Sequence, residues 1–588
     1  MKGFFNHVLF IDLSNKKFRV EKMPDAVYEN YLGGKGLATY LLLRHNEPGI
    51  DPFSSKNNFI IAVGPATDTK VWGSSRYGVF TKSPLTGIYS ESYSGGRVAE
   101  SISRTGFDAI VLQGSSSDPM WLEITDSGVV FHDAGDLWGL HTYEAEDAVK
   151  KKLAHREAGV LVIGPAGENL VRFSIIANNY WRCAGRTGVG AVLGAKKVKA
   201  LAFHGEKKRE VAYPELMSSF WDEWLEKSKD HPVVKVFKDY GTPALVAIVN
   251  KFEAFPSRYW SQGTVDGWEK IGAESLHEIC NVKPHACNKC FMACGRLTEV
   301  VQGRHKGLKI EGPEYETIYS FGGLCMVLDI NEIAYLNDIC DRLGMDTITA
   351  GNLIAFAIEA SKRGKISEKL DYGDVEAIVS LLHRIAKKEG IGAVLAEGIR
   401  HAAKEWDLED LAIHVKGMEP AAYDPRILKG MGLAYATSDR GACHLRATIF
   451  KAELSGMIAP DQIEGKAEVF VDYEDRLTLL DSLIICRFYR DLYLWDELNK
   501  IIYGTTGMNL DKQGLQKLAS RIRNATRTFN LREGITASDD TLPRRFFTEA
   551  IGSKHSVITE EELETMKKDY YRLRGWDEKG IPPPLPLI

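Results

Sequence analysis

The run Cys287-Asn-Lys-Cys290-Phe-Met-Ala-Cys294 holds three cysteines, separated by gaps of two and three residues. A further cysteine, Cys486, follows much later in the chain. Short gaps allow one loop to present several thiolates to a single inorganic centre, and a distant thiolate can complete that centre only after the chain has folded. Four thiolates suit an iron–sulfur cluster, so the pattern predicts an electron-transfer function.

Two other interpretations of this cysteine loop stay open. A structural zinc site also uses thiolates, but its second pair of ligands normally follows within about 20 residues, and Cys486 lies far beyond that. The other interpretation is that the spacing of the cysteines arises by chance, because free cysteine often behaves as a small core residue. We expect that behaviour of Cys280, Cys325 and Cys340. The odd total of nine cysteines argues against a disulfide framework.

Length and composition exclude several classes of protein. The 588 residues suffice for two to four domains, and 44% hydrophobic and 26% charged residues are ordinary for a globular protein. A net charge of −5, without a Lys/Arg stripe, argues against nucleic-acid binding. No apolar run approaches the roughly 18 residues of a membrane span, and Asp12 interrupts any secretory core. We therefore expect a cytoplasmic protein.

The spacing of apolar residues divides the chain into three predicted domains of an α+β protein. Residues 1–207 form a strand-rich domain, because short apolar runs at 59–63, 109–112, 160–163 and 199–203 lie between turn residues. Residues 208–415 and 416–588 form two mostly helical domains, with apolar residues at helical intervals over 216–229, 353–363, 375–389 and 392–405. The cysteine loop lies in the middle domain.

Two later segments echo one another, Asp341-Arg-Leu-Gly-Met-Asp346 and Asp481-Ser-Leu-Ile-Ile-Cys486. Each begins with a carboxylate and ends five residues later on a polar or thiol group. Either segment could be a capping turn between helices. The second, however, ends on the cysteine that a four-thiolate centre needs.

Three residues could bind a carbonyl group and move protons beside a redox centre: Glu316, Tyr423 and His444. The alternative for a lone histidine is a structural role. The glycine-rich run Gly188-Val-Gly-Ala-Val-Leu-Gly194 has one residue too many before its last glycine for a dinucleotide fingerprint, and it lacks a βαβ context. We therefore exclude nicotinamide binding there.

Taken together, these segments resemble the tungsten-containing aldehyde:ferredoxin oxidoreductase family over nearly the whole chain. The resemblance rests on motifs in the same order, among them Tyr31-Leu-Gly-Gly-Lys-Gly-Leu37, Thr81-Lys-Ser-Pro-Leu-Thr-Gly87, Ser94-Gly-Gly96, Gly164-Pro-Ala-Gly-Glu168, Gly312-Pro-Glu-Tyr-Glu316 and Arg440-Gly-Ala-Cys-His-Leu-Arg446. It implies a β-rich base domain of two sheets, covered by two mostly helical domains, with a bis-pterin cofactor at their interface.

The resemblance also implies the cofactors and their ligands. These are tungsten or molybdenum held by two pterins, Mg²⁺ bridging the pterin phosphates, and a four-iron four-sulfur cluster. The cluster ligands would be Cys287, Cys290, Cys294 and Cys486. The cofactor-binding positions would be Arg76, Tyr93, Ser94, Gly95, Gly96, Arg182, Cys183, Ala184, Gly185, Arg186, Asp341, Gly344, Asp346, Arg446, Asp481 and Ile485. Glu316, Tyr423 and His444 would line the substrate pocket and act as catalytic residues.

The sequence departs from the family pattern at a few positions. Ile484 and Ile485 replace Gly-Leu before Cys486, which changes the expected backbone contact to one pterin, and Tyr93 replaces an asparagine. Tyr335 and Val379 stand where some relatives carry the Glu and His that bridge two subunits through iron. If the protein is a homodimer, we expect one without bridging iron.

The function that the resemblance implies is reversible oxidation of aldehydes to carboxylic acids. Electrons would pass through the cluster to a ferredoxin or to a partner iron–sulfur subunit. Two alternatives remain: the catalytic subunit of a benzoyl-CoA-reductase-like enzyme that reduces aryl thioesters, and a non-catalytic iron–sulfur electron carrier.

Overall fold

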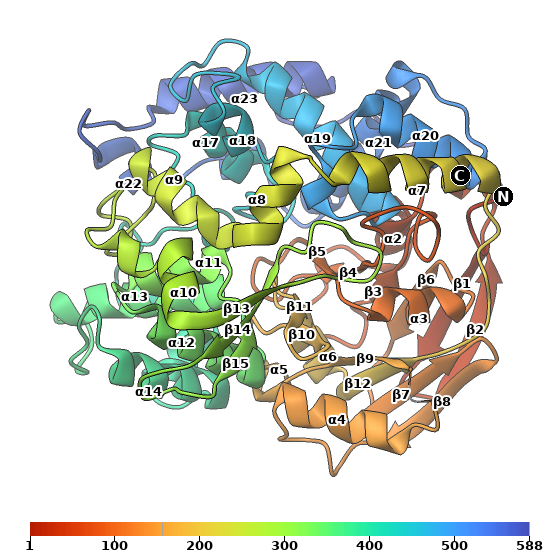
Figure 1. Ribbon diagram of the computed structural model, residues 1–588, viewed down its shortest axis with the longest axis horizontal. Helices are drawn as coiled ribbons and strands as arrows, with labels where there is room; N and C mark the ends of the chain where they lie inside the picture. Colours follow the sequence, from red (N-terminus) through yellow and green to blue (C-terminus); the bar gives the residue numbers. More distant parts are fainter. Residues whose placement is uncertain (156, 587–588) are drawn as a thin grey trace.

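The computed structural model describes residues 1–155 and 157–586, and it begins with a β-rich base (Figure 1). The first sheet of this base has the order β2 (Lys17–Lys22), β1 (His7–Asp12), β6 (Ala109–Gln113), β3 (Phe59–Ala62), β4 (Tyr77–Lys82), β5 (Tyr89–Ser94). The second has the order β11 (Arg182–Ala184), β10 (Ile176–Asn178), β9 (Gly159–Val162), β12 (Val198–Phe203), β7 (Met120–Thr125), β8 (Gly128–Asp133). Both sheets are mixed, since β1–β6 and β7–β12 are parallel pairs.

The alternating faces of these strands explain how the base is layered. On one face of the first sheet, Leu9 and Ile61 belong to a core shared with Leu161 and Leu201 of the second sheet, so the two sheets pack together. The opposite face of the first sheet, which includes Phe10, packs against helices of the C-terminal part of the chain. The first sheet is therefore covered on both faces, which anchors the helical domains to it.

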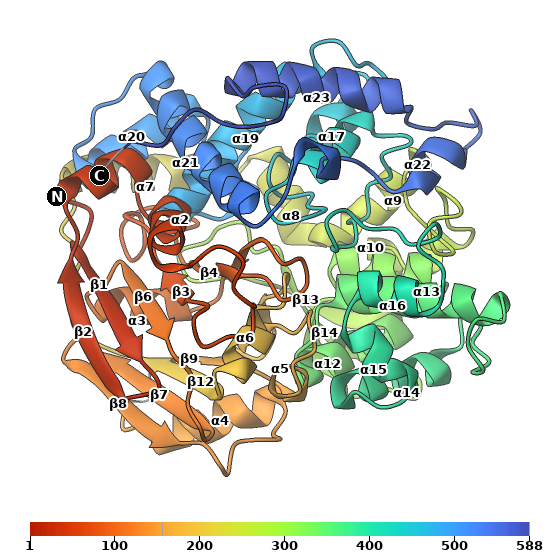
Figure 2. The same cartoon turned by 180° about the vertical axis from the view of Figure 1, so that it is seen from behind.

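The rest of the chain is mostly helical and covers the base, as predicted (Figures 1 and 2). The base contributes α1 (Asp25–Tyr31), α2 (Gly34–His45), α3 (Val98–Arg104), α4 (Thr142–Lys152), α5 (Pro165–Glu168) and α6 (Val189–Ala195). Next come α7 (Pro214–Ser228), α8 (Pro232–Tyr240), α9 (Leu245–Lys251), α10 (Ala273–Ile279), α11 (Tyr315–Thr317), α12 (Ile330–Leu343), α13 (Thr347–Lys362), α14 (Val375–Lys387), α15 (Ile391–Ala396) and α16 (Ile399–Glu405). The last are α17 (Lys429–Thr437), α18 (Phe450–Leu454), α19 (Lys466–Leu483), α20 (Trp495–Thr506), α21 (Lys512–Arg532), α22 (Arg544–Thr548) and α23 (Glu560–Arg574).

Two local features differ from the sequence expectations. The helix expected over 392–405 is two helices, α15 and α16, because Gly398 between them has a φ of 88° that breaks the helical path. The cysteine loop is not part of a purely helical region. It joins β13 (Cys280–His285) to β14 (Gly295–Val300) in a three-stranded sheet completed by β15 (Lys309–Glu311).

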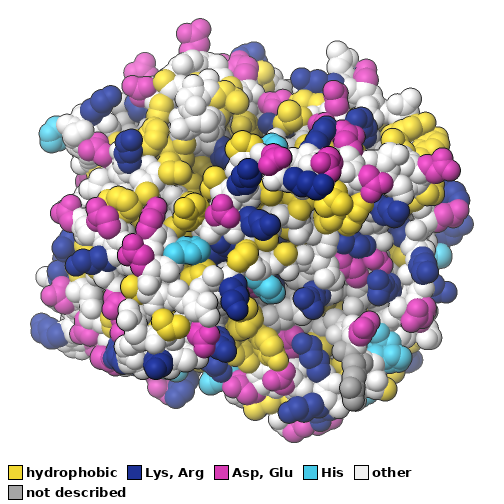
Figure 3. Space-filling view, viewed as in Figure 1, with side chains coloured by type: hydrophobic (Ala, Val, Ile, Leu, Met, Phe, Trp, Pro, Cys, Tyr) yellow, Lys and Arg dark blue, Asp and Glu magenta, His cyan; other side chains and the backbone are white. Residues whose placement is uncertain are grey.

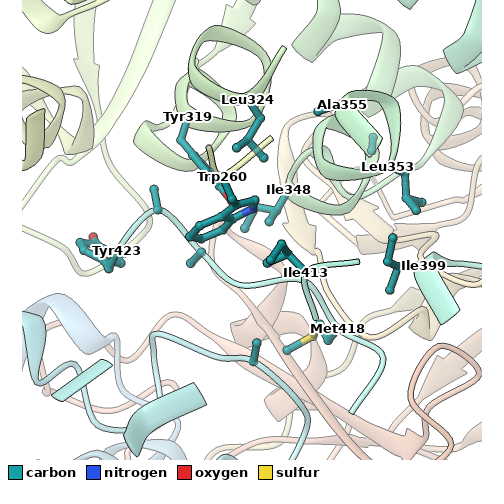
Figure 4. Close-up of a cluster of buried hydrophobic side chains, with 14 of the residues drawn as sticks. Trp260, Tyr319, Leu324, Ile348, Leu353, Ala355, Ile399, Ile413, Met418 and Tyr423 are labelled. Carbon is teal, nitrogen blue, oxygen red and sulfur yellow. The ribbon is translucent and has the colours of Figure 1, made fainter. Parts of the chain in front are cut away.

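The largest hydrophobic core lies in the helical part of the chain and includes the predicted catalytic residue Tyr423. Trp260, Tyr319 and Ile348 pack in it, with Tyr423 at one side of the same cluster (Figure 4). The Trp260 indole donates a hydrogen bond of 3.0 Å to the buried Asn352 side chain, which satisfies its only polar group. This core holds the segments that carry the candidate catalytic residues. The proposed division at residues 207 and 415 stays a prediction.

Candidate active site

The four predicted cluster cysteines line one cavity between the base and the helical domains. Cys287, Cys290 and Cys294 come from the β13–β14 connection, and Cys486 precedes a short 3₁₀ helix at Arg487–Tyr489. The Cys486 backbone N–H donates to the Gly73 carbonyl at 2.9 Å, and the Gly73 N–H donates to the Lys289 carbonyl at 2.7 Å. The loop around Gly73 thus joins the two cysteine-bearing segments.

Backbone and arginine groups approach these thiols closely. The Gly96 N–H donates to the Cys287 sulfur at 3.2 Å. The Arg76 guanidinium lies 3.9 Å from the Cys486 sulfur. A Cβ at Gly95 would lie only 2.7 Å from the Cys287 sulfur, so glycine is required at this approach.

The electrostatics of the thiols agree with their convergence. Burial raises the pKa of Cys290 to about 11, and the neighbouring Cys287 and Cys486 thiols add to the shift. Among the described residues, no three His, Cys, Asp or Glu side chains converge on a single metal ion. The four sulfurs instead share a cavity wall, which fits a multi-iron cluster.

The two echoing aspartate segments have the same backbone geometry. Asp341 lies in the last turn of α12, whose Gly344 cap is left-handed at φ 81°, and Asp481 lies in the last turn of α19, whose Ile484 cap is left-handed at φ 57°. The Met345 N–H bonds to the Cys340 carbonyl at 2.9 Å, and the Ile485 N–H bonds to the Leu480 carbonyl at 2.8 Å. Ile484 therefore keeps the helix-ending hydrogen bonds that glycine gives in the first segment.

The first segment caps a helix and also lines the cavity through Asp341 and Asp346, whereas the functional role of both segments stays a prediction. The Asp346 carboxylate caps α13 through the Ile348 N–H at 3.0 Å and accepts from Arg186 at 3.0 Å. Asp481 accepts from Arg446 at 3.0 Å and also pairs with Arg487.

The cavity has a volume of about 390 Å³ and brings together most of the predicted cofactor residues. Its lining includes Arg76, Tyr93, Ser94, Gly95, Arg182, Cys183, Gly185, Arg186, Asp341, Asp346, Arg446, Glu316 and His444. Among the described residues, Gly96, Ala184, Gly344, Asp481 and Ile485 lie outside this lining, and Tyr423 lines a second cavity.

Several buried atoms on the cavity wall lack hydrogen-bond partners within the described part of the chain. They belong to Trp181 (Nε1), Glu316 (Oε1), His444 (Nδ1) and Arg446 (Nε and Nη2). Buried polar atoms are nearly always paired in folded proteins, so such atoms beside a cavity are expected to serve a bound polar group. Together with the converging thiols, this donor set fits a phosphate-bearing pterin next to an iron–sulfur cluster.

Sequence reasoning missed several buried charged groups of this region. Glu91 pairs with Lys35 at 3.0 Å, accepts the Tyr93 phenol at 2.6 Å and also pairs with Arg446. Cys443 accepts from the Arg440 guanidinium at 3.1 Å. Burial alone would raise the pKa of this thiol, but Arg440 and Arg446 outweigh burial and lower the pKa to about 7.

A sequence signal existed for some of these groups, because Arg440 and Cys443 lie in the quoted Arg440–Arg446 motif and Arg487 directly follows Cys486. Glu91 has no local signal, since its role depends on its distant partners.

The three predicted catalytic residues lie close together, with Glu316 and His444 on the wall of this cavity and Tyr423 beside them. The His444 Nε2 lies 3.6 Å from Glu316 Oε1, and the Tyr423 ring lies 5.7 Å from the His444 ring. Burial raises the pKa of Glu316 to about 8, while burial and then Arg186 lower the pKa of His444 well below its usual value. Although the two groups are close enough for an ion pair, both shifts favour a neutral pair near pH 7.

A second, apolar cavity of about 530 Å³ reaches the same three residues from the side of α8, α9 and α18. Glu314, Glu316, His444, Leu445 and Phe488 line both cavities. The Tyr423 ring stacks on Phe450 at 3.8 Å, and both line the apolar cavity. This arrangement offers an apolar molecule a path to the buried acid, phenol and imidazole.

Comparisons with known proteins identify the family of this chain. Two family models match the chain: the N-terminal domain of aldehyde ferredoxin oxidoreductase over residues 8–205, and domains 2 and 3 of the same enzyme over residues 219–587. The chain belongs to the aldehyde ferredoxin oxidoreductase family. As a member of this family, the protein is an oxidoreductase.

Related proteins match the chain over almost its whole length. Tungsten-containing aldehyde ferredoxin oxidoreductases of Pyrococcus furiosus and Thermococcus kodakarensis are each 34% identical to it, covering 99% of the chain and 97% of their own length. The WOR-like subunit of an aliphatic sulfonate oxidoreductase of Pyrococcus furiosus is 28% identical, covering 99% and 96%. Among solved structures, a chain of the active site complex of benzoyl coenzyme A reductase has the same fold, with a TM-score of 0.85, 24% identity and coverage of 99% and 96%.

The remaining sequence expectations concern subunits and membranes. Tyr335 lies on α12 and stacks on His305 at 4.1 Å, and Val379 lies on α14. The lack of a bridging iron and the homodimer both stay predictions. In the described part of the chain, no helix is long and apolar enough to cross a bilayer.

Proposed function

We propose that the protein oxidises aldehydes to carboxylic acids, using a tungsten–pterin cofactor and an iron–sulfur cluster. In balance, one aldehyde and one water give one carboxylic acid, two protons and two electrons, and acid reduction is the reverse. The observation that carries the proposal is the meeting of the two cavities at Glu316 and His444, because an apolar substrate path there reaches the residues expected to hold the cofactor. The names of the 34% identical relatives support the same activity.

Named residues would hold each cofactor. Cys287, Cys290, Cys294 and Cys486 would bind the four-iron cluster. The two aspartate segments, with Arg76 and Arg446, would hold the pterins of tungsten or molybdenum. Backbone near Tyr93 and Cys183 would meet the pterin phosphates and a bridging Mg²⁺. When bound, the metal–pterin group supplies two-electron redox chemistry, and the cluster supplies one-electron transfer.

Tyr423 is proposed to bind the substrate carbonyl oxygen. Burial raises the pKa of its phenol well above 10, so the group stays a neutral donor. The Tyr423 ring stacks on Phe450 with 3.8 Å between ring centroids, and Tyr423 lines the apolar cavity. The O–H would therefore donate to the carbonyl group that enters along the apolar cavity.

Glu316 and His444 are proposed to move the protons. The Glu316 Oε2 accepts the Ala422 N–H at 3.1 Å, which orients the carboxyl group and leaves Oε1 toward His444. A carboxyl group with a pKa of about 8 is near the operating pH that general acid–base catalysis favours. In its deprotonated form Glu316 would accept a proton from water, and neutral His444 would pass it on.

The electron acceptor is proposed to be a ferredoxin or a partner iron–sulfur subunit. All four cluster cysteines are only partly buried, whereas Tyr423 on the substrate path is 2% exposed. Electrons can therefore leave on the cysteine side without crossing the substrate path.

Metal and pterin analysis of the purified protein, combined with an aldehyde panel read with a viologen dye, tests the proposal. We expect tungsten or molybdenum, pterin, iron and sulfide, together with dye reduction by at least one aldehyde. Iron and sulfide without pterin would instead identify an electron carrier. A complete cofactor set with turnover of an aryl thioester, but of no aldehyde, would favour the benzoyl-CoA-reductase-like alternative.

A further inference from the structure

The apolar cavity has a surface mouth and an apolar wall. Val236 on α8 and Ile248 on α9 line it and are 48% and 44% exposed, so the cavity opens between these helices. Hydrophobic side chains gather at the surface over α8 and α9 (Figure 3). A hydrocarbon body that enters along this path would be removed from water, which favours its binding.

Charged side chains interrupt this apolar wall at Glu314, Glu316, Lys451 and Arg490. Arg490 lines the cavity and is only 3% exposed. Its Nη1 donates to the Arg487 carbonyl at 2.9 Å. Within the described part of the chain, Nε is buried without a hydrogen-bond partner, and Nη2 donates no hydrogen bond.

The nearest counter-charge does not satisfy this guanidinium. The Asp491 Oδ2 lies 4.0 Å from Arg490 Nε, beyond hydrogen-bond distance, and accepts the Lys451 Nζ at 2.5 Å instead. Arg490 and Lys451 thus face one carboxylate, which leaves one positive charge unbalanced on the cavity wall. The nearby Thr448 hydroxyl is also buried and without a partner among the described residues.

The two unpaired nitrogens lie on the same edge of the guanidinium. The Nε–Nη2 edge presents two parallel N–H groups, which match the two oxygens of a carboxylate. A buried cation of this kind is costly unless an anion pairs with it. The edge therefore has the geometry of a carboxylate site inside a cavity that is otherwise suited to hydrocarbon.

We propose that the apolar cavity binds aldehydes whose far end carries a carboxylate, with Arg490 Nε and Nη2 holding that carboxylate and Thr448 as an additional donor. The inference rests on the proposed aldehyde oxidation. It adds a substrate class, the ω-oxo carboxylates, in which the aldehyde group faces Tyr423 and the acid group faces Arg490.

The first test compares ω-oxo carboxylates of increasing chain length with neutral aldehydes of the same length, in the holoenzyme with a viologen dye. The quantity compared is kcat/KM for the ω-oxo carboxylate divided by kcat/KM for the neutral aldehyde of the same length. For the best-matched length, we expect this ratio to be about 10- to 100-fold lower in Arg490→Met than in the wild type, which is the range for a charge-assisted pair of hydrogen bonds. Arg490→Lys keeps the positive charge but lacks the two parallel N–H groups, so its ratio should lie between those of the wild type and Arg490→Met. The matched control is Arg545→Met, a buried arginine that donates to Glu549 at 2.8 Å, lines neither cavity and should leave the ratio unchanged. Equal ratios in wild type and Arg490→Met at every length would overturn the proposal.

A second test does not depend on turnover. We expect a dicarboxylate product, adipate, to raise the Tm of the holoenzyme more than hexanoate does, and this difference to disappear in Arg490→Met. Equal Tm shifts by the two acids in the wild type would overturn the carboxylate site. Failure to oxidise any aldehyde, neutral or acidic, would instead contradict the proposed function, and the Tm comparison would still decide the role of Arg490.

Discussion

Replacing Glu316 with glutamine is expected to change the pH dependence of stability in a defined direction. Burial raises the pKa of this carboxyl group from 4.5 to about 8. Between these two values the folded protein keeps a proton that the unfolded chain has lost. The free energy of unfolding therefore falls as pH rises through this window, and becomes level above the folded pKa.

The magnitude follows from the size of the shift. One pKa unit corresponds to about 1.4 kcal/mol, so the whole rise from 4.5 to about 8 is equivalent to about 5 kcal/mol. Between pH 6 and pH 8 the wild type should lose about 2 kcal/mol through Glu316 alone, because the folded carboxyl group is half deprotonated at its own pKa. Glutamine has the same shape and does not titrate, so Glu316→Gln should gain stability relative to the wild type by this amount over that interval.

The measurement is the Tm of both holoenzymes from pH 6 to pH 9. The difference between them should widen up to about pH 8 and then stay constant, because contributions of other groups, such as His444, cancel in the comparison. Glu389→Gln on the surface is the control and should show a constant difference. A difference between wild type and Glu316→Gln that is the same at pH 6 and pH 9 would refute the raised pKa of Glu316. The same variant should lose at least about 100-fold in turnover with its metal content intact, as a general base would.

Three further substitutions test other parts of the site. Cys486→Ala should abolish the cluster signal in electron paramagnetic resonance, whereas Cys340→Ala, a buried thiol on α12, should retain it; an unchanged signal in the first variant excludes Cys486 as a ligand. His444→Phe should lower kcat about 100-fold or more with normal tungsten and pterin content, and normal turnover would remove His444 from proton transfer. Ile484→Gly should lower the Tm. Losing a buried isoleucine side chain that packs on Gly34 costs about 2 to 5 kcal/mol, whereas the left-handed backbone strain that glycine relieves is only about 1 to 2 kcal/mol. A higher Tm of the variant would show that the strain is the larger effect.

The secondary structure was predictable where a local pattern existed. The runs at 59–63 and 160–163 are β3 and β9, and the helical pattern at 375–389 is α14. The short β13–β15 sheet was not predicted, since its strands are partly exposed and flank a loop whose cysteines dominate the pattern. The split of one expected helix at Gly398 depends on a single backbone angle, which apolar spacing does not report.

The amino-acid sequence by itself determined the chemical types at the site: four thiols, two aspartate segments, and an acid, a phenol and an imidazole. These residues are set by chemistry that tolerates few substitutes, so their spacing carries the information. Only the tertiary structure decided the charge state of Glu316, the pairing of Glu91 with Lys35 and Arg446, and the unpaired edge of Arg490. Each of these depends on burial and on partners distant in the chain, and both arise only when the sheets and helices have packed together.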